Sequence, residues 1–403
     1  MHSPSAPPFR RVAVTAVGVV SPLGVGVDET VPALRSGHDG VSPVTDFEVS
    51  RTRCKTAGRV DLGRVRDRLA LSRQDRRRHP ASLMMMAAAH EVRRGNPTFE
   101  PELLVIGTTS GGMSSGEAFY RAQVEKRRTH ARAAWLANYL PQKPVLDAQE
   151  IWDTSAPSQI IANACASGTN AVGHAFRLVR GGHHRRVLCG GYDAISEMVF
   201  VGFDSLQAST PERIRPFDKS RTGLVLGEGA ALFALEELES AKERGAPILA
   251  EITGYGISTD NHHLTQPHPS GIGPRQAMER ALADAHREPG DVDYINAHGT
   301  ATIFNDATEG TAIAELFGDR VPVSSTKSMM GHALGAAGAI EAAFSVLALQ
   351  HQFLPPNIHL QECDPAWRLN IVANASREAR LRCVVSNSFG FGGTNATIVL
   401  EKV

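Results

Sequence analysis

A cysteine at a strand-to-helix turn is the first residue of this 403-residue chain whose setting could do chemistry. Cys165 follows an apolar strand-like run at residues 158–162 and precedes residues 171–179, which read as a helix. The positive end of a helix dipole favours a thiolate, so we expect the pKa of Cys165 to be lowered. Its small neighbours in Asn163-Ala-Cys-Ala-Ser-Gly leave room for a substrate. A free cysteine is more often an inert buried residue, and Cys189, on an apolar run, fits that description.

Two histidines strengthen the functional interpretation of Cys165. His298 follows an apolar strand and is succeeded by Gly299-Thr-Ala-Thr, and His332 stands at the start of a helix of small residues. Strand ends and helix starts are the places where α/β folds display catalytic groups. Either histidine alone could equally be a hydrogen-bonded structural residue. Together with Cys165 they indicate nucleophilic catalysis.

The sequence pattern predicts an α/β fold whose strands and helices position these residues. Short apolar runs closed by glycine or polar turns alternate with longer alanine-rich helical stretches. The clearest expected strands are residues 11–17, 103–107, 158–162, 186–189, 248–253, 294–297, 321–324 and 382–386.

The two halves of the chain resemble each other in order. Residues 11–18 parallel 248–255, residues 104–109 parallel 294–300, and residues 160–168 parallel 323–332. We interpret this as an internal duplication, although generic α/β strands could produce such pairs by coincidence. The predicted halves are residues 10–247, which hold the cysteine, and residues 248–403, which hold both histidines. No low-complexity linker separates them, so we expect one compact body.

Composition limits the partners. The 42 Lys and Arg balance 42 Asp and Glu, so bulk charge gives no reason to expect nucleic acid or an anionic membrane. The 5 cysteines include no CxxC pair, which supports neither a disulfide framework nor a zinc ribbon, and we expect no metal. No signal-peptide pattern or apolar run of membrane-span length is evident, so we expect a cytoplasmic protein.

Four motifs resemble the β-ketoacyl-acyl carrier protein synthases. They are Asn163-Ala-Cys-Ala-Ser-Gly, Asn296-Ala-His-Gly-Thr-Ala-Thr, Ser325-Thr-Lys-Ser-Met-Met-Gly-His and Asn387-Ser-Phe-Gly-Phe-Gly-Gly-Thr-Asn. They occur in the family's order, from about residue 11 to the C-terminus, and the match weakens between residues 110 and 158. The closest type is the elongating synthase I/II group of the thiolase superfamily. The resemblance implies a duplicated α/β thiolase fold with five α-β-α-β-α layers.

The family also implies roles for the three residues. Cys165 would accept an acyl group from the phosphopantetheine arm of acyl carrier protein, giving a thioester. His298 and His332 would donate hydrogen bonds to a malonyl thioester and stabilise the enolate that forms as carbon dioxide leaves. The backbone N–H groups of Cys165 and Phe391 would form the oxyanion hole. Neutral imidazoles suffice for this chemistry, so no cofactor is expected.

Further positions match the family residue by residue. Lys327 and Glu309 would lie near the triad, where a paired charge would bias local pKa values, although a purely structural ion pair is an equal interpretation. Thr300 and Thr302 match residues that bind the pantetheine arm. Asp260 matches a loop beside the entrance. Phe391, flanked by glycines, resembles a gating phenylalanine, and the alternative is a tight glycine-rich turn.

The acyl pocket and the partners are less closely specified. Ser110 stands where the fatty-acid enzymes have a larger aliphatic residue at the pocket wall, which would enlarge the pocket. Residues 110–158, with Tyr139-Leu-Pro-Gln, resemble synthases of polyene-forming type II polyketide systems, including aryl polyene pathways. Arg77 and Arg78 match basic residues that dock the acidic carrier, although such a run is often only a solvated helix face.

The assembly is expected to be a homodimer or a heterodimer with a chain-length factor. The chain could itself be such a non-catalytic factor, but those partners normally lose the nucleophile, and Cys165 is present. A thiolase or a starter enzyme that uses acyl-CoA is the enzymatic alternative. Thiolases use a second cysteine and starter enzymes show His and Asn at the later positions, so two histidines favour elongation.

Overall fold

The computed structural model describes residues 9–71, 78–126 and 132–403. The first half contains β1 (Val12–Ser21), β2 (Gly24–Val25), α1 (Val27–Ser36), β3 (Val41–Pro43), β4 (Thr56–Gly58), α2 (Leu62–Arg68), α3 (Pro80–Gly95), β5 (Leu103–Gly107), α4 (Met113–Val124), α5 (Arg132–Tyr139), α6 (Lys143–Trp152), β6 (Ser158–Ile161), α7 (Ser167–Arg180), β7 (Arg186–Asp193), α8 (Glu197–Ser205), β8 (Gly229–Glu237) and α9 (Leu238–Glu243). The second half contains β9 (Ala250–Thr259), α10 (Ile272–Asp284), β10 (Tyr294–Asn296), α11 (Ile303–Phe317), β11 (Pro322–Ser324), α12 (Lys327–Met330), α13 (Ala337–His351), β12 (Phe353–Leu354), β13 (Asn370–Ile371), β14 (Arg377–Glu378), β15 (Cys383–Gly390) and β16 (Thr394–Glu401).

The strand order confirms the predicted duplication. In the first half, β1, β8 and β7 pair antiparallel in that order, and β5 and β6 continue the sheet in parallel. In the second half, β9, β16 and β15 pair antiparallel, and β10 and β11 continue in parallel. The three sequence pairs therefore fall on equivalent strands: β1 and β9, β5 and β10, and β6 and β11.

The two half-sheets join edge to edge through β1 and β9, where Val12 pairs with Ile252 and Val14 pairs with Ala250. Within the described ranges this makes one sheet of 12 strands. The division predicted at residues 247/248 falls in the connection between β8 and β9.

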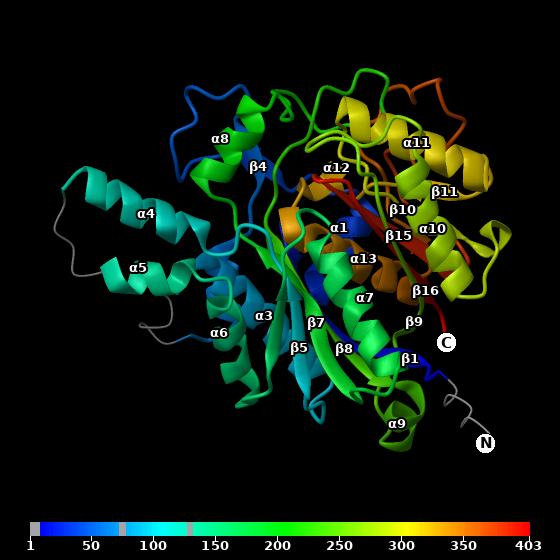
Figure 1. Ribbon diagram of the computed structural model, residues 1–403, viewed down its shortest axis with the longest axis horizontal. Coiled ribbons are helices and arrows are strands. Elements are labelled where there is room, and N and C mark those ends of the chain that lie inside the picture. Colours follow the sequence, from blue (N-terminus) through cyan, green and yellow to red (C-terminus); the bar gives the residue numbers. More distant parts are fainter. Residues whose placement is uncertain (1–8, 72–77, 127–131) are drawn as a thin grey trace.

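Helices cover and separate the half-sheets, which gives the expected five layers (Figure 1). Helix α3 packs on β1 and β8, and α10 packs on β9 and β16. Helices α7 and α13 contact each other and strands of both half-sheets, so they form the central layer. The α/β thiolase-like architecture predicted from the motifs is confirmed.

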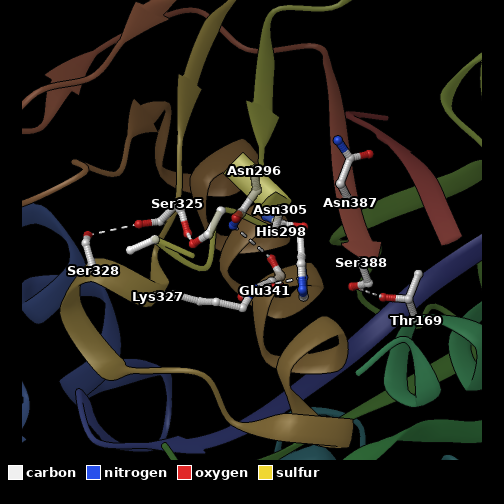
Figure 2. A network of polar contacts seen from close by, with 12 residues as sticks. Thr169, Asn296, His298, Asn305, Ser325, Lys327, Ser328, Glu341, Asn387 and Ser388 are labelled. Atoms are coloured by element: carbon white, nitrogen blue, oxygen red, sulfur yellow. Dashed lines mark hydrogen bonds and ion pairs between the residues drawn. The ribbon is translucent and has the colours of Figure 1, made fainter. Parts of the chain in front are cut away.

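The central layer is held together by close contact. A Cβ added at Gly168 of α7 would lie 2.8 Å from the backbone nitrogen of Ala339 in α13. A Cβ added at Gly338 would lie 2.0 Å from Thr169 Oγ1, whose hydroxyl also bonds Ser388 Oγ at 2.7 Å (Figure 2). Only glycine fits these crossings, and they fix the start of α7 against α13 and β15.

One segment of the described chain, Leu334–His351, is long and apolar enough to cross a membrane. It includes α13, and 89% of it is buried. Its apolar character is therefore explained by its place between the two half-sheets.

Candidate active site

A cavity opens where the two halves of the duplication meet. Cys165 enters it from the turn between β6 and α7, His298 from the end of β10, and His332 from the segment after α12. Strand β6 of the first half-sheet corresponds to β11 of the second, and β10 lies next to β11. The segments that leave these three strands all reach this cavity. Other predicted residues among those lining the cavity are Asp260, Thr300, Thr302 and Phe391.

A strained turn presents the thiol of Cys165 to this cavity. Ala164 has a left-handed φ of 55°, which is unfavourable for a residue with a Cβ. Ser167 Oγ stabilises the turn by donating to the Ala164 carbonyl and accepting from the Asn163 N–H. A Cβ at Gly390 would lie 3.1 Å from the Cys165 nitrogen, so the facing strand approaches this turn closely.

The pKa of Cys165 moves in the direction opposite to the sequence-based expectation. Burial raises the pKa of this thiol to about 11, while the charge of Lys327 and a hydrogen bond from the Phe391 backbone act to lower it. The side chain is only 6% exposed, so the cost of burying a thiolate outweighs the helix dipole. The resting residue is therefore a thiol that must transfer its proton when it reacts.

His298 is held from both sides. Its backbone N–H and that of Gly299 each donate to one oxygen of Glu309, both at 2.8 Å. The Nζ of Lys327 lies 3.2 Å from His298 Nδ1 (Figure 2). An ammonium group has donors only, so Nδ1 must accept and the ring proton lies on Nε2.

Both imidazoles are neutral, as the proposed chemistry requires. Burial lowers the pKa of His298 and of His332 well below its usual range, and the nearby charge of Lys327 lowers both further. The two rings stand perpendicular with centroids 5.3 Å apart. His298 is thus fixed as a hydrogen-bond donor through Nε2, with His332 beside it.

The ion pair of Lys327 is formed with Glu341, and the expectation that Glu309 would be its partner is wrong. Lys327 and Glu341 are both fully buried, and Lys327 Nζ bonds Glu341 Oε1. The two oxygens of Glu309 instead accept the backbone N–H groups of His298 and Gly299. Burial raises the pKa of Glu341 and of Glu309 to about 7 in each case.

Sequence reasoning missed Glu341. The available signal was a single acidic residue within the otherwise apolar and small-residue helix at 337–349. A carboxylate in such a helix costs free energy unless it is paired, which predicts a buried cationic partner.

The residues at the mouth of the cavity are connected to one another. The ring of Phe391 stacks on Phe203 with centroids 5.6 Å apart, and Gly392 and Gly393 follow with left-handed φ values of 82° and 78°. The N–H of Asp260 donates to the Gly393 carbonyl at 2.9 Å, which ties the entrance loop to the segment carrying Phe391.

Thr300 and Thr302 form a second pair at the mouth. Their hydroxyl oxygens lie 2.8 Å apart, and the Thr302 hydroxyl also caps the start of α11. Both threonines line the cavity, so their role in holding the pantetheine arm stays a prediction with a suitable geometry.

Ser110 and Arg78 are two predicted site residues that the structure describes but that do not line the cavity. The Ser110 hydroxyl donates to Asp193 Oδ1 at 3.0 Å, and Ser110 is not among the lining residues, so its place at the acyl-pocket wall stays a prediction. Arg78 pairs with Asp147 and, at 2.7 Å, with Glu150 on α6. Arg77 lies outside the described residues, and carrier docking by either arginine stays a prediction.

The described part of the chain contains no group of three or more His, Cys, Asp or Glu side chains placed to hold a metal ion. The expectation that the reaction uses no cofactor stays a prediction.

Comparison with known proteins gives matches over nearly the whole chain. A family model described as the β-ketoacyl synthase N-terminal domain matches residues 9–241, and one described as the C-terminal domain matches residues 249–361. The 3-oxoacyl-[acyl-carrier-protein] synthase 2 of Coxiella burnetii is 38% identical over 416 residues, covering 98% of this chain and 99% of the relative.

Solved structures give the same picture. The ishigamide ketosynthase/chain length factor superposes with a TM-score of 0.90 at 34% identity, covering 98% of this chain and 100% of that one. A type II polyketide ketosynthase in complex with its acyl-carrier protein and bound to the hexaketide superposes with a TM-score of 0.88 at 28% identity, over 98% and 100% of the chains.

Proposed function

Because the chain belongs to the β-ketoacyl synthase family, we propose that it is an elongating β-ketoacyl-[acyl carrier protein] synthase that uses Cys165 as its nucleophile. The observation that carries the assignment is the convergence of Cys165, His298 and His332 on one cavity, with both imidazoles neutral. An intact nucleophile disfavours the non-catalytic chain-length factor, and two histidines disfavour a thiolase or starter enzyme.

In the first half-reaction the sulfur of Cys165 attacks the acyl thioester of a carrier protein. The thiol proton passes to the departing pantetheine sulfur, directly or through a neighbouring imidazole, and the acyl group becomes a thioester of the enzyme. The backbone N–H of Phe391 is positioned at the sulfur, and with the N–H of Cys165 it forms the proposed oxyanion hole.

In the second half-reaction a malonyl thioester enters and loses carbon dioxide. The electron pair of the breaking C–C bond moves into the enolate, whose oxygen accepts hydrogen bonds from His298 Nε2 and from His332. The α-carbon then attacks the acyl carbonyl on Cys165, the carbon–sulfur bond breaks, and the β-ketoacyl product leaves on the carrier. The sulfur of Cys165 is the leaving group and is released as a thiolate, and the charge of Lys327 favours it by lowering the pKa of Cys165.

Intact-mass measurement after incubation with a panel of acyl carrier proteins tests the nucleophile. We expect one acyl group per chain, lost in Cys165→Ala and kept in Cys363→Ala, a matched control on a more exposed thiol. Acylation that persists in Cys165→Ala would refute the assignment.

The partners and pathway form the finer part of this proposal. The carrier is acyl carrier protein, and the enzyme acts as a homodimer or as a heterodimer with a chain-length factor, as the names of its structural relatives suggest. We place it in a type II polyketide system that makes polyenes, and in the cytoplasm. Activity on saturated and on conjugated polyenoyl carrier primers tests the branch, and a clear preference for saturated chains would contradict it.

The basic run before α3 remains a proposed docking site for the acidic carrier. Reversing the charges of Arg77 and Arg78 should raise the Michaelis constant of the carrier more at low than at high salt. Because Arg78 also pairs with the buried Asp147, melting temperatures must accompany the kinetics.

A further inference from the structure

Three large apolar side chains stand exposed at the mouth of the active-site cavity. Leu206, Ile303 and Phe304 all line the cavity, yet they are 56%, 60% and 54% exposed. A side chain that lines a cavity and is more than half exposed must lie at its opening. We call these three residues the apolar rim.

The rim comes from two separate helices of the fold. Leu206 follows α8, and Ile303 and Phe304 open α11, directly after the pantetheine-binding candidate Thr302 (Figure 1). Ile303 and Phe304 are both more than half exposed, so they contribute little to the core. Exposed apolar groups gathered at a functional opening indicate a contact surface.

Few charged side chains lie at the mouth of the cavity. Asp260 is the only Asp, Glu, Lys or Arg among the described residues that line the cavity, and Asn395 donates to it at 2.7 Å. Arg221 donates to the Ile303 carbonyl, but its guanidinium is paired with Asp364 at 2.7 Å and its side chain is only 7% exposed. The mouth therefore offers apolar area and little free charge to whatever docks on it.

We propose that the apolar rim is a docking contact for the folded body of the acyl carrier protein, acting in addition to any basic contacts. This inference rests on the proposed function. Cys165 is only 6% exposed, so only a thin arm can reach its sulfur, and the body that carries the arm must remain at the opening. A few well-packed residues near the centre of a contact supply most of its affinity, while charges steer the approach.

The test compares carrier-bound and carrier-free substrates. In the variant Ile303→Ser/Phe304→Ser we expect the Michaelis constant of acyl carrier protein to rise about ten-fold, with kcat and the melting temperature unchanged. The constant for the corresponding acyl-pantetheine, which lacks the carrier, should stay within about two-fold. The increase should be the same at low and high salt, because apolar contacts are not screened.

Phe9→Ser is the matched control, because Phe9 is 76% exposed and packs under Arg180 at the far end of the 14-residue helix α7. Helix α7, which is about 20 Å long, separates Phe9 from the nucleophile. The substitution should therefore change neither Michaelis constant. An unchanged carrier constant in the rim variant would overturn the inference, as would an equal rise for acyl-pantetheine, which would mean that the rim holds the arm. The proposed function would survive both results, because it fails only if Cys165 of the unaltered protein is not acylated.

Discussion

Lys327 offers the sharpest test of how the site works, because it contacts two groups with different requirements. It is fully buried, bonds Glu341, and lies 3.2 Å from His298 Nδ1. Replacing it with methionine removes the donor that fixes the His298 tautomer. Replacing Glu341 with glutamine leaves Lys327 in place as the donor to His298, but it removes the negative charge that pairs with Lys327.

The two variants should separate catalysis from stability. A hydrogen bond to a charged group contributes about 1.5–3 kcal/mol, so Lys327→Met should slow decarboxylation by about 10- to 150-fold. Glu341→Gln should slow it less, but should lower the free energy of unfolding by about 3–5 kcal/mol because an unpaired cation stays buried.

The stability of Lys327→Met should depend on pH. Burial already raises the pKa of Glu341 to about 7 with Lys327 present, and removing that charge raises it further. When the pKa of a carboxyl is higher in the folded than in the unfolded state, the free energy of unfolding of the protein falls as pH rises towards the folded-state pKa. The variant should therefore be close to the unaltered protein below pH 6 and fall increasingly behind it above pH 7.

Carbon dioxide release from malonyl carrier protein without an acyl donor measures the rate of decarboxylation. Melting temperatures at pH 6 and pH 8.5 measure the pH dependence of stability. Lys402→Met, an exposed lysine, is the control and should alter neither. Decarboxylation at the unaltered rate in Lys327→Met would refute the tautomer argument. A larger catalytic loss in Glu341→Gln than in Lys327→Met would refute it as well.

Two further predictions concern the nucleophile and its support. Burial raises the pKa of Cys165 to about 11, so the rate of its alkylation by iodoacetamide should rise about ten-fold per pH unit from pH 7 to pH 10. Peptide mass spectrometry measures this rate, and a plateau below pH 8 would contradict the prediction. Gly338→Ala should lower the free energy of unfolding by about 1–3 kcal/mol, because its Cβ would meet Thr169 Oγ1 at 2.0 Å. Gly202→Ala in α8 is the control, because no atom lies within 4 Å of the added Cβ. In the same thermal melts it should be neutral or stabilising by about 0.5–1 kcal/mol. Equal losses in both variants would show that α7 and α13 do not cross tightly at Gly338.

Much of the sheet could be predicted from local pattern. Apolar runs closed by glycine or polar turns predicted β5 and β6 almost to the residue, and the ordered resemblance of the halves predicted the equivalence of β1 with β9. Strand β8 was not predicted, because Gly229–Glu237 is rich in alanine and leucine and carries no strand periodicity when buried on both faces.

The acyl pocket and the docking surface could be predicted only in part. The apolar rim was not foreseen, because Ile303 and Phe304 look like ordinary helix residues until their exposure at the cavity mouth is known. Ser110 was expected at the pocket wall, but in the structure its hydroxyl is bound by Asp193, a buried carboxylate from the neighbouring strand. Such contacts depend on which strands are adjacent in space.

The sequence alone indicates the chemistry proposed for the site, because local pattern places Cys165, His298 and His332 at strand ends and helix starts. The tertiary structure alone decided their protonation and partners. The pKa of Cys165 rises and Lys327 pairs with Glu341 because burial and long-range contact between helices, which no local pattern encodes, control the free energy of a charge.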